Sequence, residues 1–306
     1  MKILVTGGAG FIGSHVVEAY LATGHAVAVV DTLATGRREN LPPGVRLHQV
    51  DLRDEALDGV FAEERPEVVN HHAAQASVAV SLRDPRGDAA VNVIGGLCLL
   101  ELCVRHGVRR VIYASTGGAI YGDAASLPTD ERHPAAPSSP YGVAKYALEQ
   151  YLHAFRVMHG LPSVTLRYAN VYGPRQDPHG EAGVIALFIH AMLRGEQPTV
   201  FGDGAQTRDF VGVEDVARAN VLALQSDAAG VFNIGTGVET SVNDLFARLA
   251  ALTGSPGRPA RAPARPGEVY RSVLDVRLAA ERLGWTPQVS LQEGLHRTVD
   301  WFRARL

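Results

Sequence analysis

The feature that most constrains the fold is a glycine pattern near the N-terminus, TGGAGFIG, at residues 6–13. It follows the short apolar run Lys2–Thr6 and opens an amphipathic stretch, so it lies between a strand and a helix. Gly7, Gly10 and Gly13 permit a tight turn, a close backbone approach to a diphosphate, and close packing of the helix on the strand. The helix N-terminus would then face the negative charge. The chain is therefore expected to contain a dinucleotide-binding fold.

A carboxylate ends the second apolar run, Ala26–Asp31. A carboxylate at this place can accept hydrogen bonds from both ribose hydroxyls of NAD and would repel the 2′-phosphate of NADP. Asp31 therefore predicts NAD as the cofactor. Arg37 and Arg38 lie nearby in the sequence and leave NADP as the alternative.

Short apolar runs alternate with amphipathic stretches through the first half of the chain. Continuous Val, Ile and Leu runs separated by helical patterns indicate a parallel sheet covered on both faces. The expected fold class is α/β, a Rossmann-type doubly wound parallel sheet with a smaller C-terminal substrate-binding lobe. Strands are expected at Lys2–Thr6, Ala26–Asp31, Arg46–Gln49, Val68–His71, Val111–Ser115, Ser163–Tyr168 and Val231–Ile234, and helices at Phe11–Thr23, Asp54–Glu64, Asp88–His106, Pro140–His159 and Val184–Arg194.

The pattern changes from about residue 170. Short segments interrupted by Gly and Pro follow, and Gly254–Pro266, which is dense in Pro and Arg, is expected to be extended and irregular. We therefore expect an NAD-binding domain formed by residues 1–168 with 209–238. The substrate-binding lobe would comprise residues 169–208 with 239–306.

Composition excludes several other classes of protein. Hydrophobic residues make up 46% of the chain and the net charge is −3, which favours a globular protein without the basic excess of a nucleic-acid binder. The two cysteines, Cys98 and Cys103, fit buried thiols in a reducing cytoplasm. No signal peptide or membrane span is expected. The pair His71-His72 would point to opposite faces of a strand, so no metal site is expected.

Tyr141 and Lys145 form the second pattern that points to chemistry. One helical turn separates them, so the phenol and the ammonium lie on one face of the helix predicted there. A nearby cation favours the phenolate, and the positive nicotinamide of bound NAD would favour it further, which would make Tyr141 a usable base. Only two of the 29 basic residues are lysines, Lys2 and Lys145. That scarcity singles out Lys145 as a candidate position for a required ammonium, and a coding bias that leaves two lysines by chance is the alternative.

Together these features resemble the extended short-chain dehydrogenase/reductases that act on nucleotide sugars. The resemblance extends over essentially the whole chain. Further segments that carry it are Asp51-Leu52, His72-Ala73-Ala74-Gln75, Asn92-Val93-Ile94-Gly95, Ser115-Thr116, Leu166-Arg167-Tyr168-Ala169-Asn170, Gly202-Asp203-Gly204, Thr207-Arg208-Asp209-Phe210 and Arg265-Pro266-Gly267-Glu268.

The resemblance implies a role for each matching residue. Tyr141 would be the base, Lys145 would tune it and bind the nicotinamide ribose, and a hydroxyl of Thr116 or Ser115 would bind the sugar oxygen, with Thr116 favoured. The cofactor would be held by Gly7, Gly10, Phe11, Ile12, Gly13, Asp31, Asp51, Leu52, Ala73, Ala74, Asn92, Lys145 and Tyr168. The UDP-sugar would be held by Asn170, Phe201, Arg208, Arg265 and Glu268.

The residues that follow Thr116 bear on the reaction. Family members that dehydrate or decarboxylate their sugars carry acidic residues there, whereas this chain has Gly117 and Gly118. Without a second acid/base, the resemblance implies oxidation at C4′, rotation of the keto sugar and return of the hydride, which is 4-epimerisation of UDP-glucose and UDP-galactose. A UDP-glucuronate 4-epimerase or decarboxylase and a non-catalytic NAD-binding sensor are the alternatives. The resemblance also implies a cytoplasmic homodimer that pairs through Asp88–His106 and Pro140–His159.

Overall fold

The computed structural model covers residues 1–306, and the structure describes all of them except 180–182, 256 and 265–268. Within the described residues, seven parallel strands form the central sheet in the order β10-β6-β5-β4-β1-β2-β3. The predicted fold class is confirmed. The strands are β1 (Lys2–Thr6), β2 (Ala26–Val30), β3 (Arg46–His48), β4 (Val68–His71), β5 (Arg110–Thr116), β6 (Ser163–Tyr168) and β10 (Gly230–Ile234).

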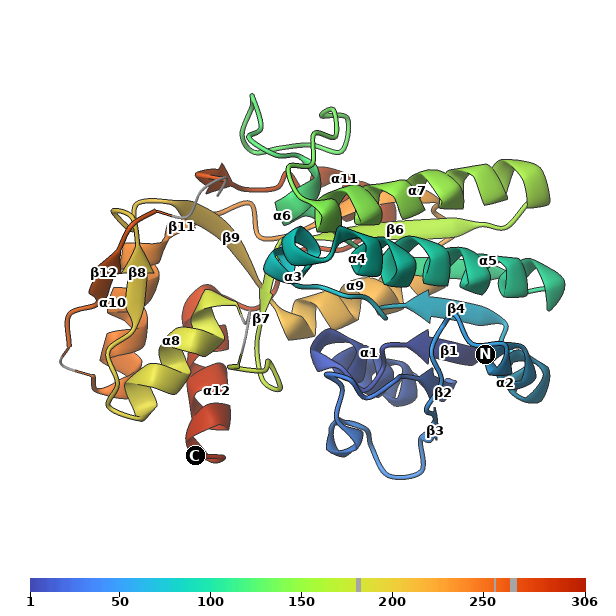
Figure 1. Cartoon of the computed structure of the whole chain (residues 1–306), viewed down its shortest axis with the longest axis horizontal. Helices are drawn as coiled ribbons and strands as arrows, with labels where there is room; N and C mark the ends of the chain where they lie inside the picture. Colours follow the sequence, from blue (N-terminus) through green and yellow to red (C-terminus); the bar gives the residue numbers. More distant parts are fainter. Residues whose placement is uncertain (180–182, 256, 265–268) are drawn as a thin grey trace.

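Helices cover both faces of this sheet (Figure 1). One face packs on α1 (Phe11–Ala22), α9 (Val213–Gln225) and α11 (Arg277–Leu283), and the other on α2 (Ala56–Glu64), α5 (Gly95–Arg105) and α7 (Pro140–His159). Neighbouring strand residues serve opposite faces, so Val29 enters the first apolar cluster and Val30 the second. The strand order reverses between β4 and β1, and α/β folds bind ligands at such a switch point.

The helix expected at Asp88–His106 begins earlier and is interrupted. Behind α3 (Val78–Arg83), the chain forms α4 (Pro85–Ala89), a π-helical turn η2 (Ala90–Ile94) and then α5. The side chain of Asn92 turns inward from η2 to the backbone of Gln75, and π-turns of this kind are frequent at functional sites.

The same stretch, Pro85–Arg105, is the one described helical segment long and apolar enough to cross a membrane by length and composition. It is 44% buried, and α4, η2 and α5 all pack against α7. A core helix passes the same test, so this finding is weak evidence for a membrane span. The expectation that no membrane is involved stays a prediction.

A smaller lobe lies beside the sheet domain, with its own apolar cluster (Figure 1). The prediction of short, interrupted segments after residue 170 was wrong for α9–α12, because apolar periodicity outweighs the scattered Gly and Pro, and serine caps start α10 and α12. The lobe contains β7 (Asn170–Tyr172), α8 (Val184–Leu193), β8 (Thr199–Phe201), β9 (Thr207–Gly212), β11 (Glu239–Ser241), α10 (Val242–Thr253), β12 (Ala260–Ala262), β13 (Arg271–Ser272) and α12 (Leu291–Arg303).

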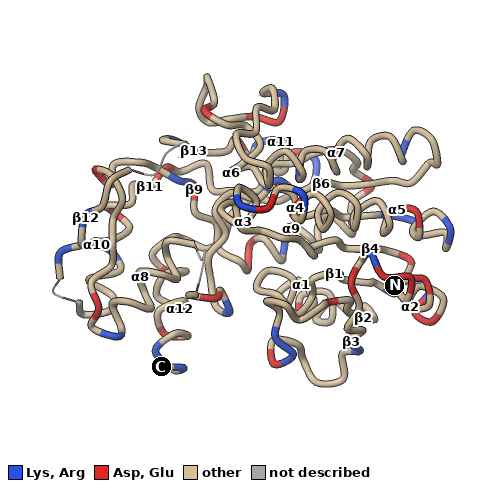
Figure 2. Tube along the Cα trace, viewed as in Figure 1, with Lys and Arg blue, Asp and Glu red and all other residues tan. Residues whose placement is uncertain are grey.

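The packing departs from the proposed division into two domains at two places. Strand β9, most of which falls in the stretch assigned to the NAD-binding domain, pairs with β7, β11 and β13 of the lobe. Helix α11 and the fully buried Trp285 pack against the sheet domain, although both fall within the stretch assigned to the lobe. The segment Gly254–Pro266 was predicted to be extended and irregular. Its residues Ala260–Ala262 form β12, which pairs with β8, and its other described residues belong to no helix or strand. Acidic and basic residues are interspersed over both parts of the molecule (Figure 2).

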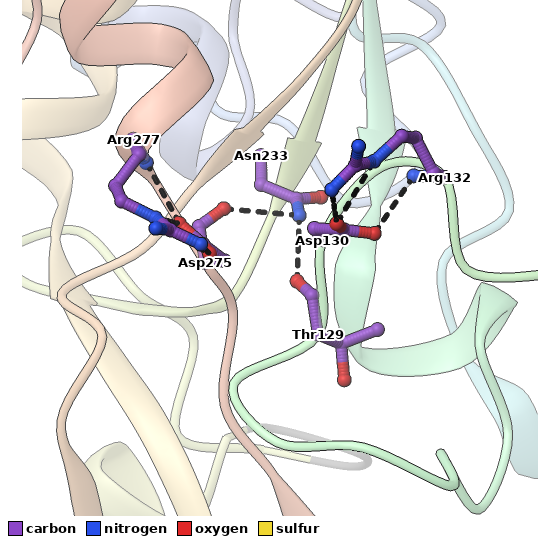
Figure 3. Close-up of polar contacts among 6 residues, drawn as sticks. All are labelled: Thr129, Asp130, Arg132, Asn233, Asp275 and Arg277. Carbon is purple, nitrogen blue, oxygen red and sulfur yellow. Dashed lines mark hydrogen bonds and ion pairs between the residues drawn. The ribbon is translucent and has the colours of Figure 1, made fainter.

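A polar cluster fastens the two parts together (Figure 3). The segment between α6 (Gly117–Ile120) and α7 leaves the sheet and pairs through Thr129 with Leu274, which follows β13. The buried amide of Asn233 donates to the carbonyls of Thr129, at 3.0 Å, and of Asp275, at 3.2 Å. Because Thr129 lies between the catalytic candidates Thr116 and Tyr141 in the sequence, this cluster anchors their connection to the lobe.

Candidate active site

The glycine turn forms the expected cradle at the switch point of the sheet. Gly7 has a φ of +68°, and a Cβ there would lie 2.5 Å from the amide nitrogen of Ala73. A Cβ on Gly13 would collide with the carbonyl oxygen of Gly7. Helix α1 begins after Gly10 with neither a capping side chain nor an acidic residue in its first turn. Its N–H groups therefore suit an anionic diphosphate, and the turn fits a dinucleotide.

Asp31 lies beside this turn and is 8% exposed. Its Oδ2 accepts from the amide of Ala9 at 3.0 Å, and its Oδ1 accepts from the amide of Leu33 at 2.8 Å. Each carboxylate oxygen keeps a second lone pair that can accept from a ribose hydroxyl. Arg37 and Arg38 are exposed, and η1 (Arg38–Asn40) follows the turn.

The other predicted cofactor residues are distributed around the same edge. Ala73 and Ala74 follow β4, and the amide of Ala73 donates to Thr6 Oγ1 at 3.3 Å. Leu52 is buried, whereas the Asp51 carboxylate pairs with Arg53 at 2.6 Å at the surface, which lowers the pKa of Asp51. Phe11 and Ile12 open helix α1.

Asn92 and Tyr168 contact protein groups rather than standing free. The Asn92 amide bonds the backbone of Gln75 twice, each time at 2.9 Å, and so fixes the loop after β4. The Tyr168 hydroxyl accepts from the amide of Asn220 at 2.9 Å and lies 3.1 Å from Nε2 of His72. Both residues therefore hold protein groups in place next to the predicted cofactor site.

Tyr141 lies in the first turn of α7, where Ser139 caps the helix by accepting from the amide of Gly142 at 3.2 Å. Burial raises the pKa of Tyr141 to about 12, the negative charge of Asp88 adds to this, and a hydrogen bond with Thr116 opposes it. The sequence predicted that Lys145 would lower the pKa of Tyr141, but Lys145 does not contribute to this shift. Without cofactor, the protein environment therefore favours the neutral phenol at neutral pH.

Lys145 is 4% exposed, one turn further along α7. Its Nζ donates to the carbonyl oxygen of Ala114 at 2.9 Å and lies 4.9 Å from the centre of the Tyr113 ring. Burial lowers the pKa of Lys145 to about 8, although the charges of Asp88 and Glu149 raise it in part. The ammonium therefore depends on neighbouring carboxylates.

Thr116 and Ser115 face different partners. Thr116 shares a hydrogen bond with Tyr141. Ser115 is buried and donates to Glu149 Oε1 at 2.6 Å, and Glu149 forms a buried ion pair with Arg167 at 2.6 Å. The hydroxyl beside the phenol thus comes from Thr116, whereas that of Ser115 is engaged behind the site.

A cavity of about 440 Å³ opens in the lobe next to this edge. It brings together three of the predicted substrate residues, Asn170, Phe201 and Arg208, whereas Arg265 and Glu268 lie outside the described residues. Sequence reasoning missed the rest of the lining, because α8 and β8 carry no motif of their own. These further lining residues are Val184, Leu187, Phe188, Ala191, Gln197, Pro198, Thr199, Val200, Gln206 and Val242.

Comparison with known proteins gives consistent matches over the chain. A model of the "NAD dependent epimerase/dehydratase family" matches residues 3–235. The UDP-glucose 4-epimerase of Mycolicibacterium smegmatis is 47% identical over 309 residues, covering 99% of each chain.

Two solved structures match the whole fold. One is a UDP-glucose 4-epimerase with UDP-glucose from Thermotoga maritima, with a TM-score of 0.98, 52% identity and coverage of 100% of this chain and 99% of that one. The other is a UDP-glucose 4-epimerase in complex with NAD from Thermus thermophilus, with a TM-score of 0.95, 50% identity and full coverage of both chains.

Proposed function

The chain belongs to the NAD dependent epimerase/dehydratase family, and we propose that it interconverts UDP-glucose and UDP-galactose through a transient 4-keto sugar. The observation that carries the choice of reaction is the space beside Thr116. A Cβ on Gly118 would lie 3.6 Å from Asn170 Oδ1 and 4.0 Å from Thr116 Oγ1, so a side chain there would point between these two groups. Loss of water needs a further acid or base at this place, and decarboxylases of the family usually carry a glutamate there, whereas epimerisation needs neither.

NAD fits the cradle formed by the glycine turn, Asp31 and the loop after β4. When bound, it accepts the hydride of C4′ and later returns it. Lys145 has two N–H groups beyond the one donated to Ala114, which suit the nicotinamide ribose. The fixed positive charge of the nicotinamide would also lower the pKa of Tyr141, which the protein alone leaves at about 12.

Tyr141 moves the proton of the sugar 4′-hydroxyl in this mechanism. The phenolate takes the proton as the hydride leaves C4′. The phenol so formed gives the proton back after the keto sugar has rotated to present its other face. Thr116 donates a hydrogen bond to the reacting oxygen and holds it within reach of Tyr141. Because one residue serves both directions, the reaction needs no second general base.

The cavity of the lobe is proposed to hold the uridine diphosphate. Phe201 offers an aromatic face for the base, Gln206 and Thr199 offer polar groups, and Arg208 suits a phosphate oxygen because a guanidinium can bind phosphate in bidentate fashion. Asn170 lies in the lining at the side of the catalytic residues and is assigned to the sugar. Arg265 and Glu268 keep their proposed roles at the diphosphate and the ribose.

A cytoplasmic homodimer completes the proposal. The outer faces of α5 and α7 expose apolar side chains, among them Val104 (36%), Val143 (51%) and Val157 (70%). Two such helices from each subunit would form a four-helix interface. Analytical ultracentrifugation of the wild type and of Val143→Glu tests it, with a dimer expected for the first and a monomer for the second.

The deciding experiment supplies purified protein separately with UDP-glucose, UDP-galactose and UDP-glucuronate, without added NAD, and identifies the products. Interconversion of the first two is expected. Reaction of UDP-glucuronate alone would contradict the substrate, and CO₂ release would contradict the reaction. No turnover of any of the three, even with added NAD, would contradict the proposed function.

A further inference from the structure

Asp88 is a buried carboxylate that the mechanism above does not use. It lies in the short helix α4, one residue before its end, is 1% exposed, and is placed where α4 and η2 pack against α7. Its Oδ1 accepts from the amide nitrogens of Gln75, at 2.7 Å, and Asn92, at 3.0 Å. Its Oδ2 is buried and has no hydrogen-bond partner among the described residues. A buried carboxylate with an unused oxygen is costly and calls for an electrostatic reason.

The groups that surround the catalytic pair supply that reason. Glu149, the other carboxylate that acts on Lys145, is already neutralised by Arg167 at 2.6 Å. His71, which ends β4, and His72, which follows it, stay neutral, because burial and the charge of Lys145 lower their pKa values, that of His72 to about 3.

Two further neighbours of the pair among the described residues carry no charge. Tyr113 on β5 has a pKa raised well above its usual value by burial, and Thr116 has no charge to offer. Asp88 has only the neutral amides of Gln75 and Asn92 as hydrogen-bond partners. Among the described residues, no adjacent cation therefore neutralises the Asp88 carboxylate, and its negative charge acts on Tyr141 and Lys145.

We propose that Asp88 is the counter-charge of the Tyr141–Lys145 pair, a positioning residue that keeps Lys145 an ammonium ion and the Tyr141 phenol able to return its proton. The second part rests on the proposed function, because only a reaction that runs in both directions needs the proton back. Through Gln75, the same carboxylate also fixes the loop that follows β4. Loss of the charge should favour both the neutral amine and the phenolate.

The lysine content of the chain allows a direct test. Because Lys2 and Lys145 are the only lysines, carbon-13 labelling at lysine Cε gives two signals, and Lys2 serves as an internal reference. In the wild type, Lys145 should titrate near pH 8. In Asp88→Asn, its midpoint should fall by about one pH unit or more, as expected for removal of a nearby opposite charge. Asp88→Glu should restore the wild-type midpoint.

Asp84→Asn is the matched control. Asp84 lies at the start of the same helix, is exposed, and accepts from the amide of Gly87, which asparagine can also do. This variant should leave the Lys145 midpoint unchanged. An equal midpoint in Asp88→Asn and wild type would overturn the proposal. If Asp88→Asn does not fold, the wild type still tests the proposal, because a midpoint at about pH 6 or below is that of a buried lysine without a counter-charge and would overturn it.

Turnover provides the second readout. Both limbs of the pH profile of kcat/KM should move to lower pH by about one unit in Asp88→Asn, because the pKa values of the phenol and the amine fall together. A merely structural role would lower the profile without moving it, which would contradict the proposal. The lysine titrations need no substrate. A wild type that does not epimerise UDP-glucose would therefore refute the proposed function and leave the titration result standing.

Discussion

The two halves of the candidate site are built in different ways. The cofactor half is made of backbone turns at the edge of the parallel sheet, with Gly7, Gly13 and Asp31 close together in space and in sequence. The half in the lobe is a cavity between α8, β8 and the start of α10, lined by side chains collected from residues 170 to 242. The difference teaches that the cofactor half depends mainly on backbone geometry, whereas the half proposed to bind the sugar nucleotide depends on the assembly of side chains from distant segments.

Tyr141, Lys145 and Thr116 lie where the two halves meet. They come from the sheet domain, yet Thr116 is near Asn170 of the lobe, and the polar cluster around Asn233 fastens the intervening segment to residues after β13. If the two halves act independently, a substitution in the cofactor half should alter only the binding of NAD, and one in the lobe only the binding of the UDP-sugar. Changes at the junction should alter the chemistry and neither binding event.

Tyr141→Phe should have the largest effect on turnover. The variant keeps the ring and loses the proton-transferring oxygen, so kcat should fall by about 10²-fold to 10⁴-fold, the usual contribution of a general acid–base group. Bound NAD and the KM for UDP-galactose should change little. Product assays together with the absorbance of the cofactor in purified protein measure both. A variant with wild-type turnover would rule out Tyr141 as the base.

Gly13→Ala should damage the cofactor half alone. The new Cβ would collide with the carbonyl oxygen of Gly7, which is backbone and cannot rotate away, so the turn must shift. NAD content after purification should drop by about tenfold or more, because a diphosphate site depends on the placement of several N–H groups. Binding of UDP by isothermal titration should persist. Gly59→Ala, at an exposed position of α2 with open space around the new Cβ, is the control for backbone substitution, and equal NAD loss there would contradict the interpretation.

The sequence predicted the cofactor half of the site better than the half in the lobe. The sheet, its parallel strands and the catalytic helix α7 were predictable because each is encoded locally, by a glycine turn, by continuous apolar runs and by Pro140 at a helix start. The lobe was less predictable because its cavity depends on contacts between distant segments. Gln197 and Gln206 carry no local signal that marks them as lining residues.

Two of the four missed helices did carry a local signal in the sequence. Ser290 is followed three residues later by Glu293, and Ser241 by Asp244, and in both cases the serine oxygen accepts from the amide of that third residue. Such pairs mark helix starts and would have located α10 and α12. Asp88 had no such signal. Its burial and its unused oxygen follow from the packing of α4 on α7, which a single sequence does not reveal.

Arg208→Gln should damage the lobe half alone. Loss of a charge-assisted hydrogen bond to a phosphate oxygen costs about 1.5–3 kcal/mol, so KM for UDP-galactose should rise by roughly tenfold to a hundredfold. NAD content and kcat at saturation should stay near those of the wild type. Arg261→Gln, in β12 and outside the cavity lining, is the matched control. A fall in kcat without a change in KM would place Arg208 at the chemistry rather than at the nucleotide.

Gly118→Ala should have the smallest effect and gives the finest test of the junction. The added methyl would meet Asn170 Oδ1 at 3.6 Å and Thr116 Oγ1 at 4.0 Å, which are ordinary contact distances, so the fold should tolerate it. It would occupy room beside the reacting sugar, and a misplacement at this distance should lower kcat/KM a few-fold, about 1 kcal/mol or less. The melting temperature and NAD content should match the wild type. Unchanged kcat/KM would mean that Gly118 faces no part of the bound sugar, and the choice of epimerisation over dehydration would lose its structural support.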